Sequence, residues 1–421
     1  MGCLGIKKGM KAVVFTLGCK VNSCESASII KGLSDLGYEV SDELGYADLY
    51  VLNTCSVTAE AQKKSRQLVA RVRKFNSNAK IIVCGCASQN APNDFVGKDG
   101  VSLVIGTRNK SKIVNMIDSS GVFISDNDEY YVENLPPKRL KTRAFIKVQD
   151  GCNNFCSYCI IPYLRGRSRS RSVESIKSEI DYLNPTEAVL TAINLSAYNY
   201  NGTTLGGLLD SLSGVNCRIR LGSLEEVIIS EEFLKGTQKL TNFAPHFHLS
   251  LQSGSDDVLK SMNRHYLTND FERSVNLIRE FYPLAGITTD VIVGFPTETE
   301  EDFTNTLEFC KKIKFSDIHC FPFSPRKGTV AYGLKDLPSD VKKDRLNRLL
   351  ELKKQLKDEF INANLGRVSE VVFEEFDGTY YIGYTENYIK TYVLGEFSKN
   401  ISKVLLEKPY NDGVIASIIK E

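Results

Sequence analysis

Short apolar runs alternate with longer amphipathic stretches along the first 90 residues. The apolar runs at residues 12–15, 49–52 and 81–83 predict strands, whereas the stretches at 24–36 and 59–75 predict helices. Strands and helices in regular alternation indicate a parallel α/β layer. The chain is therefore expected to begin with a parallel α/β domain.

The pattern changes at two later points. Two prolines within residues 134–139 break regular structure, and basic residues follow them, so this segment is expected to be a linker. Further apolar runs at 187–191, 246–249 and 289–293, each followed by a helical pattern, predict a partial (β/α) barrel. A helix with leucines at 346, 349, 350, 352 and 356 is predicted over 339–360. Five short β-like runs then predict a small barrel: 369–373, 380–384, 389–394, 404–406 and 414–418.

Composition narrows the class of protein. At 421 residues the chain is long enough for two or three domains, and its formal net charge of +2 gives no general attraction to phosphate. No apolar run is long enough to span a bilayer, and the first residues lack the apolar core of a signal peptide. We therefore expect a cytoplasmic protein with no membrane partner.

Twelve cysteines in such a chain favour metal binding or catalysis over disulfides. Cys152, Cys156 and Cys159 form a Cys-x3-Cys-x2-Cys loop, and three thiolates at this spacing hold three irons of a four-iron cluster and leave one iron open. A zinc site or a ferredoxin-type cluster is the alternative, but both ordinarily use four ligands, and no fourth ligand stands near this loop.

Three more cysteines follow predicted strands in the first domain. Cys19 follows the first strand, Cys55 the second and Cys86 the third, and ligands bind at the carboxyl ends of strands in open α/β sheets. Cys84 is a competing candidate to Cys86, and core packing is the alternative for all of these thiols. The remaining cysteines, Cys3, Cys24, Cys217, Cys310 and Cys320, are expected to be small apolar residues.

These motifs resemble a known family. The segment 151–162, with Tyr158 before the third cysteine, resembles the signature loop of the radical S-adenosylmethionine (SAM) enzymes, which chelate SAM on the open iron. The segments 17–22, 53–58 and 85–89 resemble the cluster domain of the methylthiotransferases, with Cys86 at the ligand position. Segments 245–266, 290–299 and 321–329 are also similar to that family, whereas Gly222 and Glu226 depart from the Ser and Pro usual there.

The resemblance implies the fold class and the domains. It implies a Rossmann-like parallel α/β domain at 9–134, a partial (β/α) radical-SAM barrel at 138–365 and an all-β TRAM-like barrel at 366–421. It also implies two 4Fe-4S clusters, one on Cys152, Cys156 and Cys159 and a second on Cys19, Cys55 and Cys86. Ser250, Gln252, Arg264 and Gly294 are the candidate SAM-binding residues. No catalytic residue beyond the cluster ligands follows from the sequence.

Segments 18–22 and 53–58 look most like the branch that modifies threonylcarbamoyladenosine. The implied reaction adds a methylthio group to C2 of this adenosine next to the tRNA anticodon, with an electron donor such as flavodoxin or ferredoxin and a sulfur source as further partners. Isopentenyladenosine tRNA or a ribosomal-protein aspartate is the alternative substrate, and a non-catalytic iron–sulfur protein is a third possibility.

Two groups of residues are candidates for tRNA contact. One is basic: Lys63, Lys64, Arg66, Arg71, Arg73 and Lys74 on the second predicted helix, with Arg165, Arg167, Arg169 and Arg171 after the cluster loop. The other is aromatic: Tyr380, Tyr384, Tyr388 and Tyr392, which are expected to stack on bases.

Overall fold

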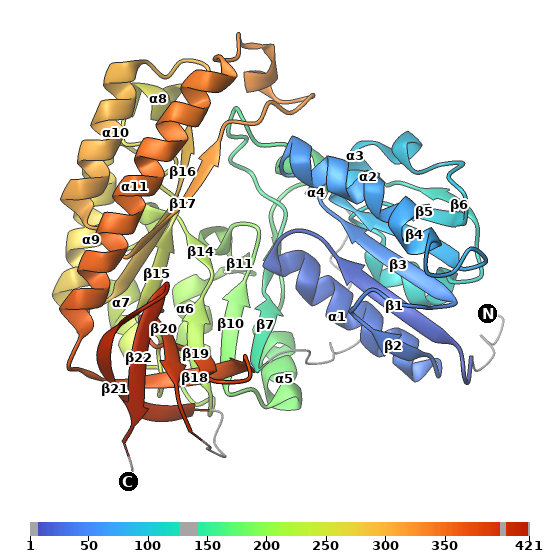
Figure 1. The fold of residues 1–421 in the computed structure, drawn as a ribbon, viewed down its shortest axis with the longest axis horizontal. Coiled ribbons are helices and arrows are strands. Elements are labelled where there is room, and N and C mark those ends of the chain that lie inside the picture. Colours follow the sequence, from blue (N-terminus) through green and yellow to red (C-terminus); the bar gives the residue numbers. More distant parts are fainter. Residues whose placement is uncertain (1–6, 126–141, 396–400, 420–421) are drawn as a thin grey trace.

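A computed structural model describes residues 7–125, 142–395 and 401–419 of the chain. The predicted linker at 134–139 and Cys3 lie outside these described residues. Figure 1 shows an N-terminal α/β unit beside a central unit of strands and helices, with a small red barrel covering one end of the central strands. Mixed α/β architecture with parallel sheets and a small C-terminal barrel is therefore confirmed.

The N-terminal unit is a parallel sheet with helices on both faces. Its strand order is β2-β1-β3-β4-β5-β6. Alternate residues of β1 face different cores: Ala12 and Val14 pack with α1, whereas Val13 packs with α2. The bounds are β1 (Lys11–Thr16), α1 (Lys20–Asp35), β2 (Glu39–Ser41), β3 (Leu49–Thr54), α2 (Ala59–Arg73), β4 (Lys80–Gly85), α3 (Cys86–Asn90), β5 (Val101–Ile105) and β6 (Gly121–Phe123).

All three strands predicted here are present. The helix predicted from residue 24 begins instead at Lys20, because Val21 is the single apolar residue among residues 20–23 and one such residue does not reveal a helical turn. Cys19 is consequently the residue that caps this helix.

The central unit is a partial barrel of parallel strands followed by helices. Its two sheets have the orders β7-β10-β13 and β14-β15-β16-β17, and one large apolar core fills the space between strands and helices. Its main strands are β7 (Arg143–Lys147), β10 (Glu187–Thr191), β13 (Arg218–Leu221), β14 (Ser223–Leu224), β15 (His246–Leu249), β16 (Gly286–Val293) and β17 (Asp317–Pro322). Its helices are α4 (Ile161–Arg165), α5 (Val173–Leu183), α6 (Leu205–Ser211), α7 (Glu231–Gln238), α8 (Asp256–Ser261), α9 (Thr268–Phe281) and α10 (Glu300–Ile313). Two short hairpins accompany them, β8 (Gln149–Asp150) with β9 (Arg169–Ser170) and β11 (Asn199–Tyr200) with β12 (Thr203–Thr204).

The long helix α11 (Ser339–Asn364) packs along β17. Leu349, Leu352 and Leu356 are buried in the central core, as the leucine spacing predicts. Leu350 was also assigned to this apolar face, but it is 42% exposed, so that part of the prediction is wrong. One residue corresponds to about 100° of helix rotation, which carries Leu350 away from the buried face that its neighbour Leu349 occupies.

The last five strands close into a barrel, as predicted. Their order is β18-β19-β20-β22-β21, with bounds β18 (Val368–Phe376), β19 (Tyr381–Thr385), β20 (Lys390–Val393), β21 (Ile401–Tyr410) and β22 (Gly413–Ile418). No helix within the described residues is both long and apolar enough to cross a membrane.

A buried ion cluster joins this C-terminal barrel to the amino ends of the central strands. Glu187 accepts hydrogen bonds from Arg218 and from Arg220 (Nε to carboxylate oxygen 2.8 Å). These arginines also donate to carbonyl oxygens of the C-terminal barrel, among them Glu370 and Thr385, both at 3.0 Å. Burial raises the pKa of Glu187, but the arginines outweigh it and hold the pKa at about 2.

Replacement of Glu187 by alanine is expected to destabilise the fold by about 3–5 kcal/mol, because it leaves buried arginines without their counter-charge. Guanidinium unfolding at pH 7 measures this loss. Since the folded pKa of Glu187 is depressed, wild type should also lose stability as the pH falls from about 4.5 towards 2, a loss that E187Q should not show.

The exposed Glu231, which pairs with Lys235 one helical turn away, provides the matched control, and E231A should cost less than about 1 kcal/mol. An equal effect of both alanine substitutions would contradict the assigned role of Glu187.

Candidate functional site

Cys19, Cys55 and Cys86 lie at the carboxyl ends of adjacent strands. Strands β1, β3 and β4 are parallel neighbours, so the loops that follow them meet at one edge of the sheet. The three thiols are close enough to interact electrostatically with one another. The sheet thus brings together the three cysteines that the sequence places at strand ends.

The motif residues beside these cysteines fasten the loops to one another. The side-chain amide of Asn22 donates to the carbonyl oxygens of Leu17 (2.8 Å) and Thr54 (3.2 Å), and so links the loops that carry Cys19 and Cys55. Gly18 has a φ of 113°, and a Cβ at this position would lie 3.1 Å from the Cys55 sulfur. Only glycine allows this approach without strain.

Cys84 and Cys86 have different surroundings although only Gly85 separates them. Cys84 is fully buried in the apolar core on the α1 side of the sheet, and burial raises the pKa of its thiol to about 12. Cys86 begins α3 and packs against Ile160 and Leu164, next to the second cysteine loop. This placement favours Cys86 as the ligand, as the motif position predicts.

Positive charge is concentrated behind the N-terminal thiols. Arg165 is fully buried and acts electrostatically on Cys19 and Cys86. It belongs to a cluster in which Lys110, Lys147, Arg165 and Arg169 surround the carboxylates of Glu25 and Asp150. Four cations against two carboxylates leave a formal excess of +2 within this group. Burial raises the pKa of the Cys86 thiol, and Arg165 and Lys110 oppose that rise without cancelling it.

The loop of Cys152, Cys156 and Cys159 follows β7 and β8, at the carboxyl end of the central strands. Gly151 has a φ of 72°, and a Cβ on it would collide with the Arg167 carbonyl oxygen, so this turn requires glycine. The Arg264 guanidinium lies 3.2 Å from the Cys156 sulfur. Burial and the neighbouring Cys156 raise the pKa of the Cys159 thiol to about 12.

Both groups of three thiols fit an iron–sulfur cluster better than a single ion. Four-coordinate zinc with bonds of about 2.3 Å brings its sulfurs within about 4 Å of one another. Among the described residues, His248, Asp290 and His319 form the single group of three potential ligands whose atoms all lie within 4.8 Å. Each cysteine group is therefore more widely spaced than one ion needs. Burial raises the pKa of the Cys86 and Cys152 thiols, a cost that a bound cationic metal offsets.

The four candidate SAM-binding residues lie in different surroundings. Ser250 and Gln252 follow β15, and the backbone of Gln252 pairs with β16 through Asp290 and Ile292. Gln252 has a φ of 67°, a conformation that costs energy for any residue except glycine and that is common at functional sites. Both residues therefore lie at the carboxyl end of a barrel strand.

Arg264 has a carboxylate partner within the chain. Its Nη2 donates to Glu225 Oε1 at 3.0 Å, and Asn154 of the cluster loop and Asn194 donate to the same carboxylate. Glu225 therefore lies against the cluster loop, and sequence reasoning missed it. The acidic pair Glu225–Glu226 in a segment that otherwise matches the family was the available signal. Burial raises the pKa of Glu226 to about 7.

At Gly294 the structure gives a different close contact from the one expected. The φ of 71° requires glycine, but a Cβ here would collide with the side chain of Lys342 on α11. A cofactor contact at Gly294 therefore remains a prediction. At Gly222 a Cβ would lie 2.9 Å from the Leu190 carbonyl oxygen, so the break between β13 and β14 is tightly packed.

A cavity of about 780 Å³ connects all three parts of the chain. Its wall includes Cys19 and Lys20 from the N-terminal unit, barrel strands β10 and β13–β17, helix α11, and Tyr384 and Tyr388 from the C-terminal barrel. Tyr388 stacks on Tyr384 (ring centroids 4.7 Å) and on His246 (4.4 Å). Tyr384 and Tyr388, two of the tyrosines predicted to stack on RNA bases, thus form the floor of the cavity.

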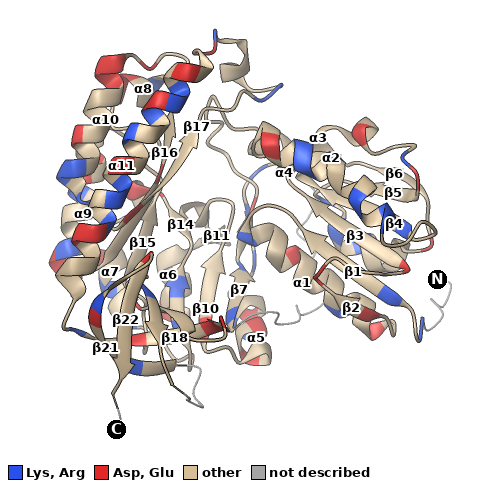
Figure 2. Ribbon diagram, viewed as in Figure 1, with Lys and Arg blue, Asp and Glu red and all other residues tan. Residues whose placement is uncertain are grey.

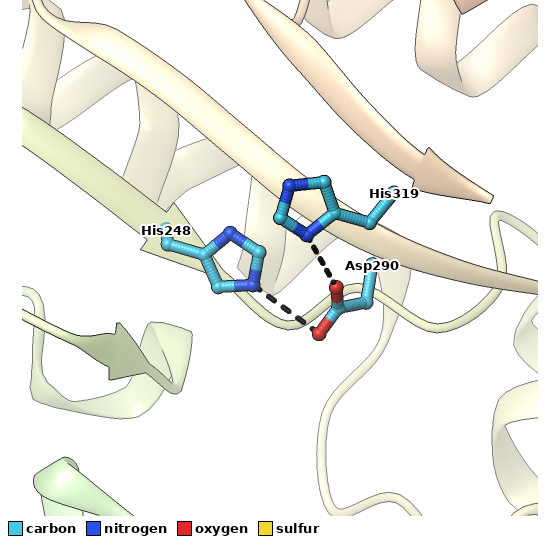
Figure 3. Close-up of side chains that lie close together, drawn as sticks. All are labelled: His248, Asp290 and His319. Carbon is cyan, nitrogen blue, oxygen red and sulfur yellow. Dashed lines mark hydrogen bonds and ion pairs between the residues drawn. The ribbon is translucent and has the colours of Figure 1, made fainter. Parts of the chain in front are cut away.

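A hydrogen-bonded trio lines this cavity on three adjacent strands, β15, β16 and β17 (Figure 3). His248 Nε2 lies 3.2 Å and His319 Nδ1 3.1 Å from the Asp290 carboxylate, so each imidazole donates to it. This leaves Nε2 of His319 as a proton acceptor. Burial raises the pKa of Asp290, but the two hydrogen bonds outweigh it and hold the pKa well below its usual range.

A chain of hydrogen bonds continues from the trio. Because His248 Nε2 donates to Asp290, a neutral His248 accepts at Nδ1 from the Thr288 hydroxyl, 2.9 Å away. Thr288 then accepts from His246 Nε2, also at 2.9 Å. His246 and His248 both line the cavity. Of their four ring nitrogens, His246 Nδ1 is the one buried without a partner among the described residues.

Two of the four arginines after the cluster loop are buried and cannot belong to the phosphate-binding surface that their spacing suggests. Arg165 is fully buried, and Arg171 is buried in an ion pair with Glu179. Sequence spacing alone does not distinguish a solvated arginine from one paired inside the protein. On α2, Arg66 and Arg73 pair with Asp94 and Asp99 at its side. Figure 2 shows both signs of charge interleaved along the helices, as the small net charge implies.

Comparisons with known proteins agree with this site. Residues 146–310 match the model of the radical SAM superfamily, and residues 11–106 match the uncharacterized protein family UPF0004. The barrel and its three-cysteine loop thus define a radical SAM protein.

More specifically, the chain belongs to the radical SAM methylthiotransferase family. It is 37% identical to the threonylcarbamoyladenosine tRNA methylthiotransferase MtaB of Bacillus subtilis, over 98% of each chain. Identity to the MtaB of Thermotoga maritima is also 37%, over 97% of each chain. A tRNA-2-methylthio-N(6)-dimethylallyladenosine synthase of Clostridium tetani is 35% identical over 82% of each chain.

Solved structures share the fold at low identity. The radical SAM methyltransferase TsrM of Kitasatospora setae, with cobalamin and a 4Fe-4S cluster bound, has a TM-score of 0.54 at 16% identity, over 74% of this chain and 75% of that one. The cobalamin-dependent SAM radical enzyme OxsB has a TM-score of 0.53 at 13% identity, over 83% and 57% respectively. The likeness extends beyond the central barrel.

Proposed function

We propose that this protein is a tRNA methylthiotransferase, which adds a methylthio group to C2 of N6-threonylcarbamoyladenosine next to the anticodon. The observation that carries the proposal is the presence of two groups of three thiols at strand ends, one of which reaches a 780 Å³ cavity through Cys19, in a chain similar from end to end to MtaB enzymes. A volume of this size accommodates a modified nucleoside.

We assign each cysteine group to one 4Fe-4S cluster. Cys152, Cys156 and Cys159 would hold the cluster with the open iron, and Cys19, Cys55 and Cys86 would hold the second one. When bound, these clusters supply the electron that cleaves SAM into a carbon radical and the site from which sulfur is delivered. The chain's own residues bind the substrate, exclude water from the cavity and hold the thiolates beside Arg165 and Arg264.

Ser250, Gln252, Arg264 and Gly294 remain our candidates for SAM contact, and Glu225 is added to them. Glu225 joins the cluster loop to Arg264 and Asn194, so its contacts hold that loop against the barrel. The His319 Nε2 atom is available in the cavity as a proton acceptor for the substrate.

The remaining expectations extend this proposal. We propose domains at 9–134, 138–365 and 366–421, the first Rossmann-like and the last a TRAM-like module that assists tRNA binding. A cytoplasmic location, an electron donor such as flavodoxin or ferredoxin, and a separate sulfur source complete it. Dimethylallyladenosine tRNA is the second candidate substrate, because a synthase of that nucleoside is 35% identical to this chain.

Nucleoside mass spectrometry of tRNA tests the proposal. A strain that lacks this gene is expected to lose the methylthio derivative of threonylcarbamoyladenosine and to retain its unmodified precursor. The wild-type gene should restore the product. Loss of the methylthio-dimethylallyl nucleoside instead would assign the second substrate, and an unchanged profile would reject a tRNA role at this position.

A further inference from the structure

Lys20 is a cation of the cavity wall for which the described residues provide no ion-pair or hydrogen-bond partner. It is the first residue of α1, and its side chain lines the cavity next to Cys19. Within the described part of the chain, no carboxylate or other acceptor lies at hydrogen-bond or ion-pair distance from Lys20 Nζ. The charged groups that act on it are Arg143, Arg220 and Glu187, and Glu187 is already paired with the arginines.

Every other charged side chain of the cavity wall is paired inside the protein. The pairs are Arg220 with Glu187, Lys357 with Asp317, Lys390 with Asp412, and Asp290 with His248 and His319. Among the described residues of the wall, Lys20 is thus the cation left to neutralise a bound anion. The Lys20 side chain is exposed, so a ligand can reach it. A hydrogen bond from such a cation to an anionic group is roughly twice as strong as one between neutral groups.

The position of Lys20 indicates which part of a substrate it meets. Lys20 interacts with Arg143, Arg220 and Glu187, which lie at the start of β7, within β13 and at the start of β10. This region is towards the amino ends of the strands, whereas the loop of Cys152 lies at their carboxyl ends. A group that extends from the base deep into the barrel reaches Lys20.

We propose that Lys20 binds the carboxylate of the threonylcarbamoyl substituent and thereby selects this nucleoside. The inference rests on the proposed function. Threonine is attached through its amino group, so its carboxylate remains free to pair with a cation. A dimethylallyl group is a neutral hydrocarbon and leaves Lys20 unpaired in the cavity, which disfavours it.

The experiment compares anticodon stem–loop RNAs that differ only in the substituent. One carries threonylcarbamoyladenosine, a second carries its primary amide in place of the carboxylate, and a third carries dimethylallyladenosine. Fluorescence anisotropy with the full-length reconstituted protein, without reductant, gives a Kd for each RNA in the absence of turnover. We expect wild type to bind the acid about 10- to 100-fold more tightly than the amide, the range of one hydrogen bond to a charged group.

Variants assign this preference to Lys20. K20Q should reduce the ratio of the affinity for the acid RNA to the affinity for the amide RNA to about one. K20R should retain most of this ratio. K357Q removes another lysine of the same cavity, one that is paired with Asp317, and should keep the wild-type ratio. Thermal unfolding shows whether each variant is folded, and iron content shows whether it holds its iron–sulfur clusters.

The outcomes that contradict the role of Lys20 differ from those that contradict the proposed function. A wild-type ratio near one, or a K20Q ratio equal to that of wild type, overturns the proposal for Lys20. A K20Q variant that loses SAM affinity while its RNA ratio is unchanged shows that Lys20 binds the methionine carboxylate of SAM instead. Failure of the proposed function is seen separately, because wild type with SAM and reductant would then form no methylthio product on any of the three RNAs.

Discussion

Replacement of Cys152, Cys156 or Cys159 by alanine is expected to reduce both reductive SAM cleavage and methylthio transfer to background. An open iron needs all three thiolates, and the loop that presents them is fixed by Gly151 and Arg264, with no fourth cysteine beside it among the described residues. Each variant should retain about four of the roughly eight irons of the wild-type chain, those of the N-terminal cluster.

The measurements are 5′-deoxyadenosine by mass spectrometry and iron per chain after reconstitution. C217A is the matched control, because Cys217 is a half-buried thiol beside β13 that lines neither the cavity nor a cysteine group. It should keep both activities and full iron content. Substantial 5′-deoxyadenosine formation by C156A would rule out this loop as the site of SAM cleavage.

Replacement of Cys19, Cys55 or Cys86 by alanine should separate the two half-reactions. These thiols lie on the N-terminal unit, whereas we assign SAM cleavage to the loop of Cys152, Cys156 and Cys159. The variants should therefore still form 5′-deoxyadenosine but transfer no methylthio group to tRNA. Iron content should fall by about four atoms per chain. The two domains touch where Cys86 packs on Ile160 and Leu164, so a moderate reduction in the rate of SAM cleavage is also expected.

Cys84 provides the sharpest control for this second prediction. It lies two residues from Cys86 but in the apolar core, and C84A should keep the cluster and the product at a small cost in stability, about 1 kcal/mol. If C84A loses the iron and C86A retains it, the ligand assignment is reversed. Loss of SAM cleavage in all three N-terminal variants would contradict the division of labour between the two clusters.

Local sequence pattern was sufficient for much of this fold. Strands of β-branched and apolar residues stood out in every part of the chain because their burial is encoded within a few residues. The placement of Cys19, Cys55 and Cys86 at one sheet edge followed from the same pattern, since parallel neighbours end on the same side. The helix start at Lys20 was missed because its first turn holds a single apolar residue, Val21.

The cavity depends on contacts that no local pattern contains. Arg218 donates to the Tyr384 carbonyl oxygen, 166 residues away, and Tyr388 reaches the cavity through a backbone φ of 76°. The prediction that Arg165 and Arg171 contact phosphate was also wrong, because closely spaced arginines in a sequence do not show whether water or a buried carboxylate surrounds each guanidinium. The trio of His248, Asp290 and His319 could not be predicted from the sequence, because the pairing of β15, β16 and β17 brings these three residues together.

The floor of the cavity has a consequence for the order in which the protein matures. All six cysteines that we assign as ligands lie within the first 159 residues, whereas Tyr384 and Tyr388 leave the ribosome near the end of synthesis. Domains fold from the N-terminus as the chain emerges, so both cysteine groups form while this end of the barrel is still open. Iron and sulfide can therefore be inserted into the nascent protein before its last strands close the chamber.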